Sequence, residues 1–418
     1  PPSPSPPAWP QPPEASAAQL QALDRKVDQQ LNLVMHHPLL QRLEATWRGL
    51  HHLVQHSETG EDLQIRVLNL SKADLARTLR RYRGSSWDQS PLFKRLVDDG
   101  LGTAGGDPLG CVVLDQTFDH SPPDVETLRE LARIGAAMHA PVIAAAAPAL
   151  LQMETWRELP KPRDLLKIFQ ATEYAAWRSL READEARHLV LTLPHFLARA
   201  PYGGSAADAA PYRFQEELGG GAHQACVWAS SAYLLALNLH RAFTMHGWCT
   251  RIRGLQGGGA VEELPAGAPP LCPVEVEIAE RRAAELDRAG LAALVWRASA
   301  GLAVFQHTPT LHHPPEYDDP QASANARLAS ELPCQMAINR VIHHMRALLR
   351  DELDGNTDRA AIQAALDHWL ADYIDPDAGS PGAFAAPARP FAAAEVVVDE
   401  MAGSPGIFSL HLQATPNL

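Results

Sequence analysis

Hydrophobic residues near the start of the chain recur with the period of an α-helix. From residue 17 to residue 35 the apolar positions are three or four residues apart, at Leu20, Leu23, Val27, Leu31 and Val34. This spacing predicts an amphipathic helix, which Pro38 ends because proline lacks the amide hydrogen that a helix interior needs. A second amphipathic helix is predicted from Leu39 to Val54, with an apolar stripe of Leu40, Leu43, Trp47, Leu50 and Val54.

Beyond Gly60, short apolar runs alternate with helical periods. Strands are predicted at Gln64–Leu70, Gly110–Asp115, Pro141–Ala145, His188–Leu193, Glu275–Ile278, Leu291–Val295 and Gly301–Phe305. Helices are predicted from Ser71, whose hydroxyl can cap the first turn, and at Pro123–His139, Val227–His246, Ala322–Leu349 with an interruption near Pro333, and Asp358–Tyr373. This alternation indicates βαβ units around a partly parallel sheet, so the predicted fold class is mixed α/β.

The end of the chain contains two predicted strands that stand apart from the others. A linker rich in Pro, Gly and Ala, Asp375–Pro390, precedes Ala394–Glu400 and Gly406–Gln413, which a Gly/Pro turn joins. A hairpin of two strands is at best marginally stable in water, so we expect it to pair with a sheet of this chain or of another chain. The candidate inter-chain residues are Ala394, Glu395, Val396, Val397, Val398, Asp399, Ile407, Phe408, Ser409, Leu410, His411 and Leu412.

Composition narrows the class of protein. The 418 residues include 36 Lys+Arg against 49 Asp+Glu, and the net charge of -13 opposes binding to nucleic acid or to an anionic membrane. Eight of the 35 prolines lie in Pro1–Pro13, which predicts a flexible tail rather than a signal peptide or a membrane helix. The longest apolar run, near Ala140–Leu151, is too short to span a bilayer. Five scattered cysteines without a C-x-x-C pair favour free thiols in a reducing cytoplasm.

No pattern in the chain predicts a catalytic, cofactor-binding or metal site. Histidines cluster at His36/His37, His51/His52/His56, His312/His313 and His343/His344, but no H-E-x-x-H motif and no acid or cysteine at ligand spacing accompanies them. The glycine-rich stretches Gly102–Gly110 and Gly254–Gly259 lack the P-loop and dinucleotide signatures, so tight backbone packing is the favoured role. The G-x-S-x-G motif of hydrolases does not occur.

Long ungapped blocks of the chain resemble one protein family, in that family's order. They run from about Leu31 to about Phe408 and include His36–Val54 (HHPLLQRLEATWRGLHHLV), Ile65–Leu75 (IRVLNLSKADL), Ser90–Gly110, Phe118–Leu150, Glu158–Leu165 (ELPKPRDL), Leu191–Gly203, His246–Pro265 and Tyr317–Pro333 (YDDPQASANARLASELP). These blocks resemble the large subunit of the type VI secretion contractile sheath, the TssC or VipB family.

This resemblance implies a mechanical function and a sheath-protein fold, with N-terminal helices and a C-terminal β-hairpin arm. Such a subunit pairs with a small sheath subunit, TssB-like or VipA-like, polymerises helically around an Hcp-like inner tube and contracts to propel it. By resemblance, a baseplate and an AAA+ disassembly ATPase of the ClpV type are further partners, and the location is the bacterial cytoplasm. The resemblance implies no enzymatic activity, no cofactor and no insertion into a membrane.

Two departures limit what the resemblance transfers. In the family an N-terminal helix is the implied recognition site of the disassembly ATPase, whereas the first 13 residues here are Pro-rich, so that site is assigned to no residue. The chain also stops at Leu418, where the family is expected to continue into another strand, so a truncated arm is expected.

The predicted organisation has five parts. They are a Pro-rich tail at 1–16, N-terminal helices at 17–56 that contact the small subunit, an α/β sheath body at 57–374, a linker at 375–390, and a strand arm at 391–418 for β-augmentation between subunits. The apolar helices Ala17–Val54 and Val227–His246 are expected to supply surface for the small subunit. A helix with exposed charges at Asp358, Arg359, Asp367 and Asp372 is a candidate contact for the inner tube.

Two other classes of function stay open from the residues. An α/β enzyme would use Gly204–Gly221 as a lid over a pocket with convergent polar groups. A soluble adaptor would bind one partner through the C-terminal hairpin.

Overall fold

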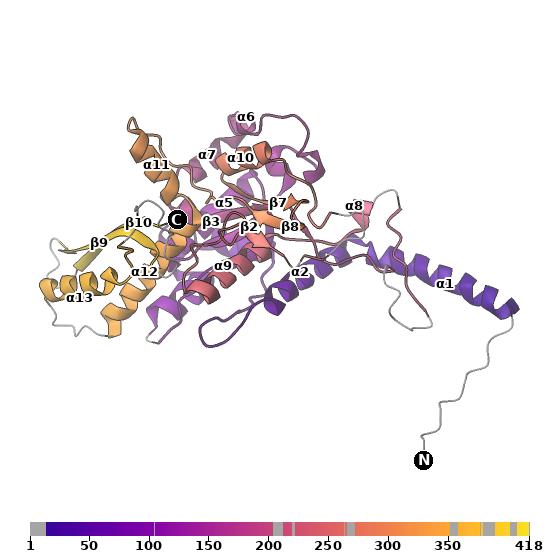
Figure 1. The fold of residues 1–418 in the computed structure, drawn as a ribbon, viewed down its shortest axis with the longest axis horizontal. Coiled ribbons are helices and arrows are strands. Elements are labelled where there is room, and N and C mark those ends of the chain that lie inside the picture. The colour runs from indigo at the N-terminus through magenta and orange to yellow at the C-terminus, as the bar shows by residue number, and fades with distance from the viewer. Residues whose placement is uncertain are drawn as a thin grey trace, which may run out of the picture.

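A six-stranded sheet forms the centre of the computed structural model (Figure 1). Across the sheet the strands are β1 (Val112–Phe118), β2 (Val142–Ala146), β3 (Leu189–Leu193), β7 (Leu291–Arg297), β8 (Leu302–Phe305) and β6 (Ala260–Val261). The first four run parallel, and β8 and β6 are antiparallel to their neighbours. The mixed α/β prediction is confirmed.

The structure describes residues 14–103, 105–203, 212–219, 222–262, 264–265, 272–351, 358–376, 378, 389–401 and 408–417.

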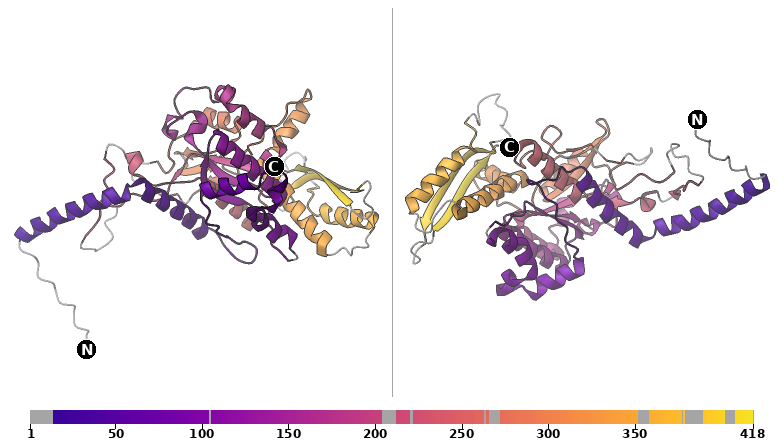
Figure 2. Two further views of the ribbon diagram at one scale, coloured as in Figure 1. Left: turned by 180° about the vertical axis from the view of Figure 1, so that it is seen from behind. Right: turned by 90° about the horizontal axis from the view of Figure 1, so that it is seen from below.

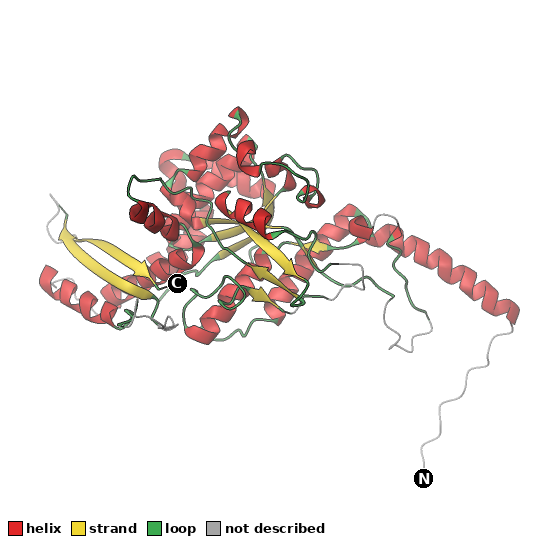
Figure 3. Ribbon diagram, turned by 45° about the horizontal axis from the view of Figure 1, so that its top comes forward, coloured by secondary structure: helices red, strands yellow, loops and turns green. Residues whose placement is uncertain are grey.

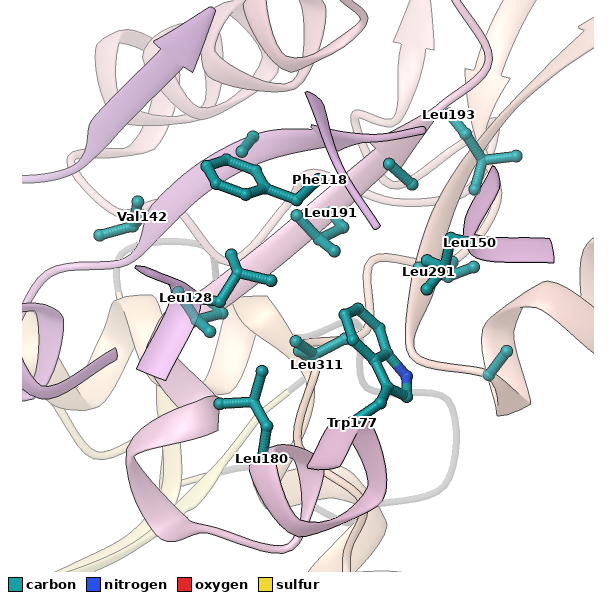
Figure 4. Close-up of a cluster of buried hydrophobic side chains, with 14 of the residues drawn as sticks. Phe118, Leu128, Val142, Leu150, Trp177, Leu180, Leu191, Leu193, Leu291 and Leu311 are labelled. Atoms are coloured by element: carbon teal, nitrogen blue, oxygen red, sulfur yellow. The ribbon is translucent and has the colours of Figure 1, made fainter. Parts of the chain in front are cut away.

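Side chains of the central strands enter two separate cores because a strand directs successive residues to opposite faces. In β3, Leu191 lies in the first core and Val190 in the second. The first core is covered by α5 (Pro122–Met138), α7 (Ala175–Arg181) and α10 (Glu280–Arg288), and Figure 4 shows Trp177 and Leu180 packed toward Leu191. The second is covered by α9 (Ala232–His246). Burial on both faces explains why β2 is a continuous apolar run and why β3 is apolar except for Thr192.

Two long helices extend from one side of the body, and a helix and hairpin unit lies on the opposite side (Figure 1). The helices at the first end are α1 (Glu14–Met35) and α2 (Pro38–Gln55). The unit at the other end contains α12 (Leu332–Asp351), α13 (Arg359–Ala371), β9 (Phe391–Glu400) and β10 (Phe408–Pro416). The remaining α-helices and short strands are α3 (Lys72–Arg81), α4 (Pro91–Phe93), α6 (Leu165–Ile168), α8 (Ala222–Ala225), α11 (Pro320–Ala329), β4 (Phe196–Leu197) and β5 (Trp228–Ala229), and a π-helix spans Lys94–Gly102.

Helix boundaries follow the local signals in the sequence. The Ser71 hydroxyl accepts a hydrogen bond from the Asp74 amide and caps α3, as predicted. The predicted interruption near Pro333 is confirmed, since α11 ends at Ala329 and α12 begins at Leu332.

Two predicted strands are wrong. Gln64–Leu70 is extended but unpaired. It runs beside β1, whose pairing with β2 changes register between Val113 and Thr117. Such a bulge interrupts the regular edge that a further strand needs. Glu275–Ile278 forms no strand either, because the chain there makes one isolated bridge, at Val274, and then turns Glu275 inward.

Candidate assembly interfaces

Helix α2 is attached to the body through α9. Leu53 is buried in a small cluster with Tyr233 and Leu237. Gly49 allows the close approach, because a Cβ atom at this position would lie 2.5 Å from Cδ2 of Tyr233. One side of α2 is therefore fixed to the body, whereas Leu39, Leu43, Trp47 and Val54 stay exposed.

A buried ionic cluster holds the junction between α1 and α2. The Arg199 guanidinium contacts Glu44 Oε1 through Nε at 2.6 Å and Glu216 Oε2 through Nη1 at 2.5 Å, and His36 Nε2 lies 3.2 Å from Glu216 Oε1. Burial would raise the pKa of Glu216, but hydrogen bonds from Arg199 and from the Tyr202 amide outweigh it and lower the pKa. The carboxylate is thus kept charged, and the cluster joins both helices to the segment around residue 216.

The described part of the Gly-rich loop lies along α1. The Tyr212 hydroxyl donates to Asp28 Oδ1 at 2.6 Å, the Asn32 amide group donates to the Gln215 carbonyl at 3.3 Å, and the Glu217 amide donates to Asn32 Oδ1 at 2.9 Å. These contacts place residues 212–217 on a helix rather than over a pocket. Residues 204–211 and 220–221 of the lid prediction lie outside the described residues.

Large apolar side chains are exposed along both α1 and α2. Trp47 is 63% exposed, and Leu20, Leu23, Val27, Leu33, Val34, Leu39, Leu43 and Val54 are exposed as well. We call these nine residues the apolar face. Large exposed apolar side chains gathered on two consecutive helices have the character of a docking surface.

The expectation that Val227–His246 supplies part of this surface is wrong. Residues 232–240 of α9 are all buried, because the sheet covers one side of the helix and α2 the other. Only the end of α9 reaches solvent with a large apolar side chain, at Met245.

The C-terminal hairpin packs on helices rather than on another sheet. Strands β9 and β10 pair antiparallel, with Val396 opposite Leu412, and neither joins a third strand among the described residues. Val396 and Val398 are buried against Leu366 of α13 and Val341 of α12. Figures 2 and 3 show the two strands lying across these helices. The extra stabilisation that a two-stranded hairpin needs thus comes from a helical surface.

The outer edge of β9 is occupied within the chain. The Gln363 side chain donates to the Val396 carbonyl at 2.7 Å and accepts from the Val398 amide at 2.9 Å, and Arg359 Nε donates to the Val398 carbonyl at 2.5 Å. Because these backbone groups point away from β10, those of the opposite residue Leu412 point away from β9. No described residue bonds to the Leu412 backbone, so β10 carries the open edge.

The predicted inter-chain residues fall on both strands. Those at 394–399 lie in β9, those at 408–412 lie in β10, and Ile407 lies outside the described residues. The sequence does not predict that Gln363 and Arg359 cover the edge of β9, because nothing in helical periodicity shows which polar side chain will face a distant strand.

The charged residues proposed for tube contact have roles inside the chain. Asp358 caps α13 by accepting from the Ala361 amide, Arg359 binds β9, and Asp367 accepts from Gln363. Asp372 is exposed. Contact with an inner tube remains a prediction.

A buried ionic cluster in the body joins Glu275 to two histidines. Glu275 bridges His195 Nδ1 at 2.6 Å and His223 Nε2 at 3.1 Å. Burial would raise the pKa of Glu275, but the two histidines lower it to about 2. Among the described residues no group of three or more His, Cys, Asp or Glu side chains could hold a metal ion.

No described helix is long and apolar enough to cross a membrane.

The stretch Gly254–Gly259 forms a tight turn. Gly258 has a φ of +82°, and a Cβ atom there would lie 2.2 Å from the Arg251 carbonyl oxygen. The Gly254 amide donates to the Phe305 carbonyl, which fastens the turn to β8. The glycines therefore allow close backbone packing, as the glycine-rich pattern predicts.

Two family models match most of the chain. VipB (EvpB/VC_A0108, tail sheath N-terminal domain) matches residues 17–312, and VipB_2 (EvpB/VC_A0108, tail sheath gpW/gp25-like domain) matches residues 321–418. A relative, the type VI secretion system sheath protein TssC1 of Pseudomonas aeruginosa, is 46% identical over 396 residues, which are 93% of this chain and 80% of that protein.

Two solved structures of an anti-feeding prophage are also similar. One is its baseplate, with a TM-score of 0.41 and 12% identity, covering 85% of this chain and 80% of that chain. The other is its helical sheath in the contracted state, with a TM-score of 0.30 and 14% identity, covering 69% of this chain and 70% of that chain.

Proposed function

This chain belongs to the VipB tail sheath family, and we propose that its C-terminal hairpin receives a β-strand from a neighbouring subunit. The chain is a structural subunit of a type VI secretion contractile sheath. The difference between the two hairpin edges supports the proposal. Gln363 and Arg359 fill the edge of β9, whereas the backbone of β10 is open at Leu410 and Leu412. An open edge supplies main-chain donors and acceptors in the spacing that an added strand requires.

Strand exchange suits a lattice that must contract. Main-chain hydrogen bonds of an added strand persist while a linker absorbs rotation between subunits. In this proposal the linker that absorbs rotation is the one before the donated strand of the neighbouring subunit, because the ends of residues 375–390 in this chain are held together, with the Asp375 amide donating to the Phe391 carbonyl at 2.8 Å. Strand β10 within the arm at 391–418 is the acceptor. The acceptor residues among the sequence candidates are then Leu410 and Leu412.

The remaining partners are assigned from the family and from the surfaces of α1 and α2. A small sheath subunit of the TssB type covers the apolar face, which 17–56 presents. Copies of the heterodimer polymerise around an Hcp-like tube on a baseplate, and a ClpV-like ATPase recycles them. The protein works in the bacterial cytoplasm and acts mechanically rather than as an enzyme.

A proline at Leu412 tests the strand acceptor. Proline removes the outward amide of Leu412, while Leu412→Ala loses similar packing and keeps the amide. Each variant is co-expressed with the small sheath subunit of the same bacterium and examined by negative-stain electron microscopy. Wild type and L412A are expected to give long hollow tubes, and L412P only soluble heterodimer.

The deletion of residues 394–418 is the complementary test, with the same expectation of heterodimer without tubes. It also removes Val396 and Val398 from the packing of α13, so the proline variant is the cleaner measurement. Normal tubes from L412P would refute strand addition at β10.

A further inference from the structure

The segment Gln64–Leu70 is extended but pairs with no strand. No turn or bend interrupts residues 63–71, yet none of them belongs to a β-ladder. Within the described part of the chain, residues 64–70 form no backbone–backbone hydrogen bond. The sequence has the pattern of a strand here, and what is missing is the neighbour with which a strand pairs.

Contacts near both ends fix this segment against the body. Ile65 packs into the cluster between α2 and α9. The Gln116 side chain donates to the Leu70 carbonyl at 3.4 Å, and just beyond, Lys72 Nζ donates to the Thr117 carbonyl at 2.7 Å. The segment is therefore already extended before any partner arrives, which reduces the conformational entropy lost when a strand is added.

Strand β1 does not supply the missing pairing. Its bulge between Val113 and Thr117 breaks the regular ladder, and a side chain, Gln116, bridges to the segment where a backbone group would otherwise do so. The carbonyl oxygen of the same Gln116 side chain is buried and accepts no hydrogen bond from the described residues. This side of the segment is thus held by a side chain, and no other described residue bonds to the backbone of residues 64–70.

The direction of the backbone groups follows from the Leu70 contact. Its carbonyl faces β1, and backbone groups in an extended chain alternate from one side to the other. The groups of Leu68 therefore also face β1, while those of Ile65, Val67 and Asn69 face away. Val67 and Leu68 are both exposed, at 69% and 55%.

We infer that Gln64–Leu70 is completed by a β-strand from the same partner chain that covers the apolar face of α2. The inference rests on the proposed pairing with a small subunit. Ile65 shares its cluster with Leu50 and Leu53 of α2, so the strand edge and the apolar face adjoin. One partner that lays a helix on α2 and a strand beside Val67 covers both surfaces. Its strand bonds to the backbone of Ile65, Val67 and Asn69 and offers apolar side chains to Val67 and Leu68.

Hydrogen exchange at single-residue resolution in the purified heterodimer tests this directly. The amides of Ile65, Val67 and Asn69 are expected to exchange at least about tenfold more slowly than those of Arg66 and Leu68. Uniformly fast exchange over residues 64–70 in an intact heterodimer would overturn the added strand and leave the proposed pairing in place. Failure of the two proteins to co-purify at all would overturn the pairing, and this inference with it.

Two adjacent proline variants give an independent readout. Val67→Pro removes an outward amide, and Leu68→Pro removes an amide that faces β1; both side chains are exposed and neither amide is bonded in the chain. We expect V67P to weaken the heterodimer at least about tenfold in a pull-down titration, because an edge hydrogen bond is lost and the added strand is displaced. L68P loses a side-chain contact but keeps the outward amides, so it should weaken binding clearly less than V67P does. Equal binding by both variants would contradict the inference.

Discussion

The central sheet and the two ends of the molecule differ in how far their backbone groups are paired and their apolar side chains are buried. In the sheet, β2 and β3 are paired on both edges and buried on both faces. At the N-terminal end the helices leave the apolar face exposed, and at the C-terminal end β10 leaves one edge open. Strands β2 and β3 find all their partners within the chain, whereas the apolar face and the outer edge of β10 have none among the described residues. Substitutions in the body should therefore lower the stability of the fold, and those at the ends should lower association.

The largest effect is expected from Trp177→Ala in the first core. Trp177 is fully buried and packs near Leu180 and Leu191 (Figure 4). Truncation of a buried tryptophan leaves a cavity and costs about 3–5 kcal/mol of unfolding free energy. Urea titration of the co-purified heterodimer, followed by far-ultraviolet circular dichroism at fixed concentration, measures the loss. A loss of unfolding free energy below about 1 kcal/mol would show that this core does not stabilise the fold more than the two ends do.

The next effect is a pH dependence at the junction between the body and α12. Burial raises the pKa of Glu331 to about 7, with a further contribution from Asp287, although Arg253 opposes the shift. An unfolded glutamate has a lower pKa, so between about pH 5 and pH 7 the folded state holds a proton that the unfolded state has released. This group therefore makes the protein less stable as pH rises through that window.

Glu331→Gln isolates this contribution. Buried histidines such as His312, whose pKa is lowered to about 4 by burial, change stability in the opposite direction, so the variant is compared with wild type at each pH. The urea midpoint of E331Q relative to wild type should rise steadily from pH 5 to pH 8. A difference that does not vary with pH would mean that Glu331 is ionised throughout.

A smaller effect is expected where α13 covers the edge of β9. Gln363→Ala removes two hydrogen bonds to the strand and should cost about 1–2 kcal/mol in the C-terminal unit. It also opens a second strand edge, which should give irregular aggregates beside normal tubes in electron micrographs. Gln363→Glu keeps the acceptor for the Val398 amide and serves as a partial control. Tubes of wild-type regularity from Q363A would show that the covered edge has no protective role.

The smallest effect on stability is expected at Trp47, which contrasts with Trp177. Trp47 is 63% exposed, and Trp47→Ala should change the unfolding free energy by less than about 0.5 kcal/mol. Binding to the small subunit should nevertheless weaken by about tenfold or more, because exposed aromatic residues often dominate interfaces. Isothermal titration or a pull-down titration measures this. The control is Met245→Ala at the exposed end of α9, which should leave binding unchanged.

Much of the fold could be predicted from local pattern. The helices at α1, α2 and α5 and the buried strands β2, β3 and β7 coincide closely with the predicted ranges. Their signals are strong because the spacing of apolar residues reflects burial directly. The two-residue strands β4, β5 and β6 were missed, since two residues carry no periodicity.

The assembly surfaces were predictable only in part. The sequence located the hairpin and the apolar helices, and long blocks resembled the sheath family. It did not distinguish exposed Trp47 from buried Trp177, because both lie among apolar neighbours. It also assigned Val227–His246 to an interface, whereas α2 and the sheet bury that helix from both sides.

The sequence by itself determined the fold class, most elements and the family, since these depend on local periodicity and on long matching blocks. Only the tertiary structure decided which strand edges stay unpaired and which apolar side chains stay exposed. A strand pattern such as Gln64–Leu70 or β10 specifies that backbone groups need partners, but not whether the partner is a side chain, a neighbouring strand or another molecule. That depends on groups far apart in the chain, such as Gln363 beside Val396 and Gln116 beside Leu70. Pairing between distant residues has no local period, and for that reason it becomes visible only in three dimensions.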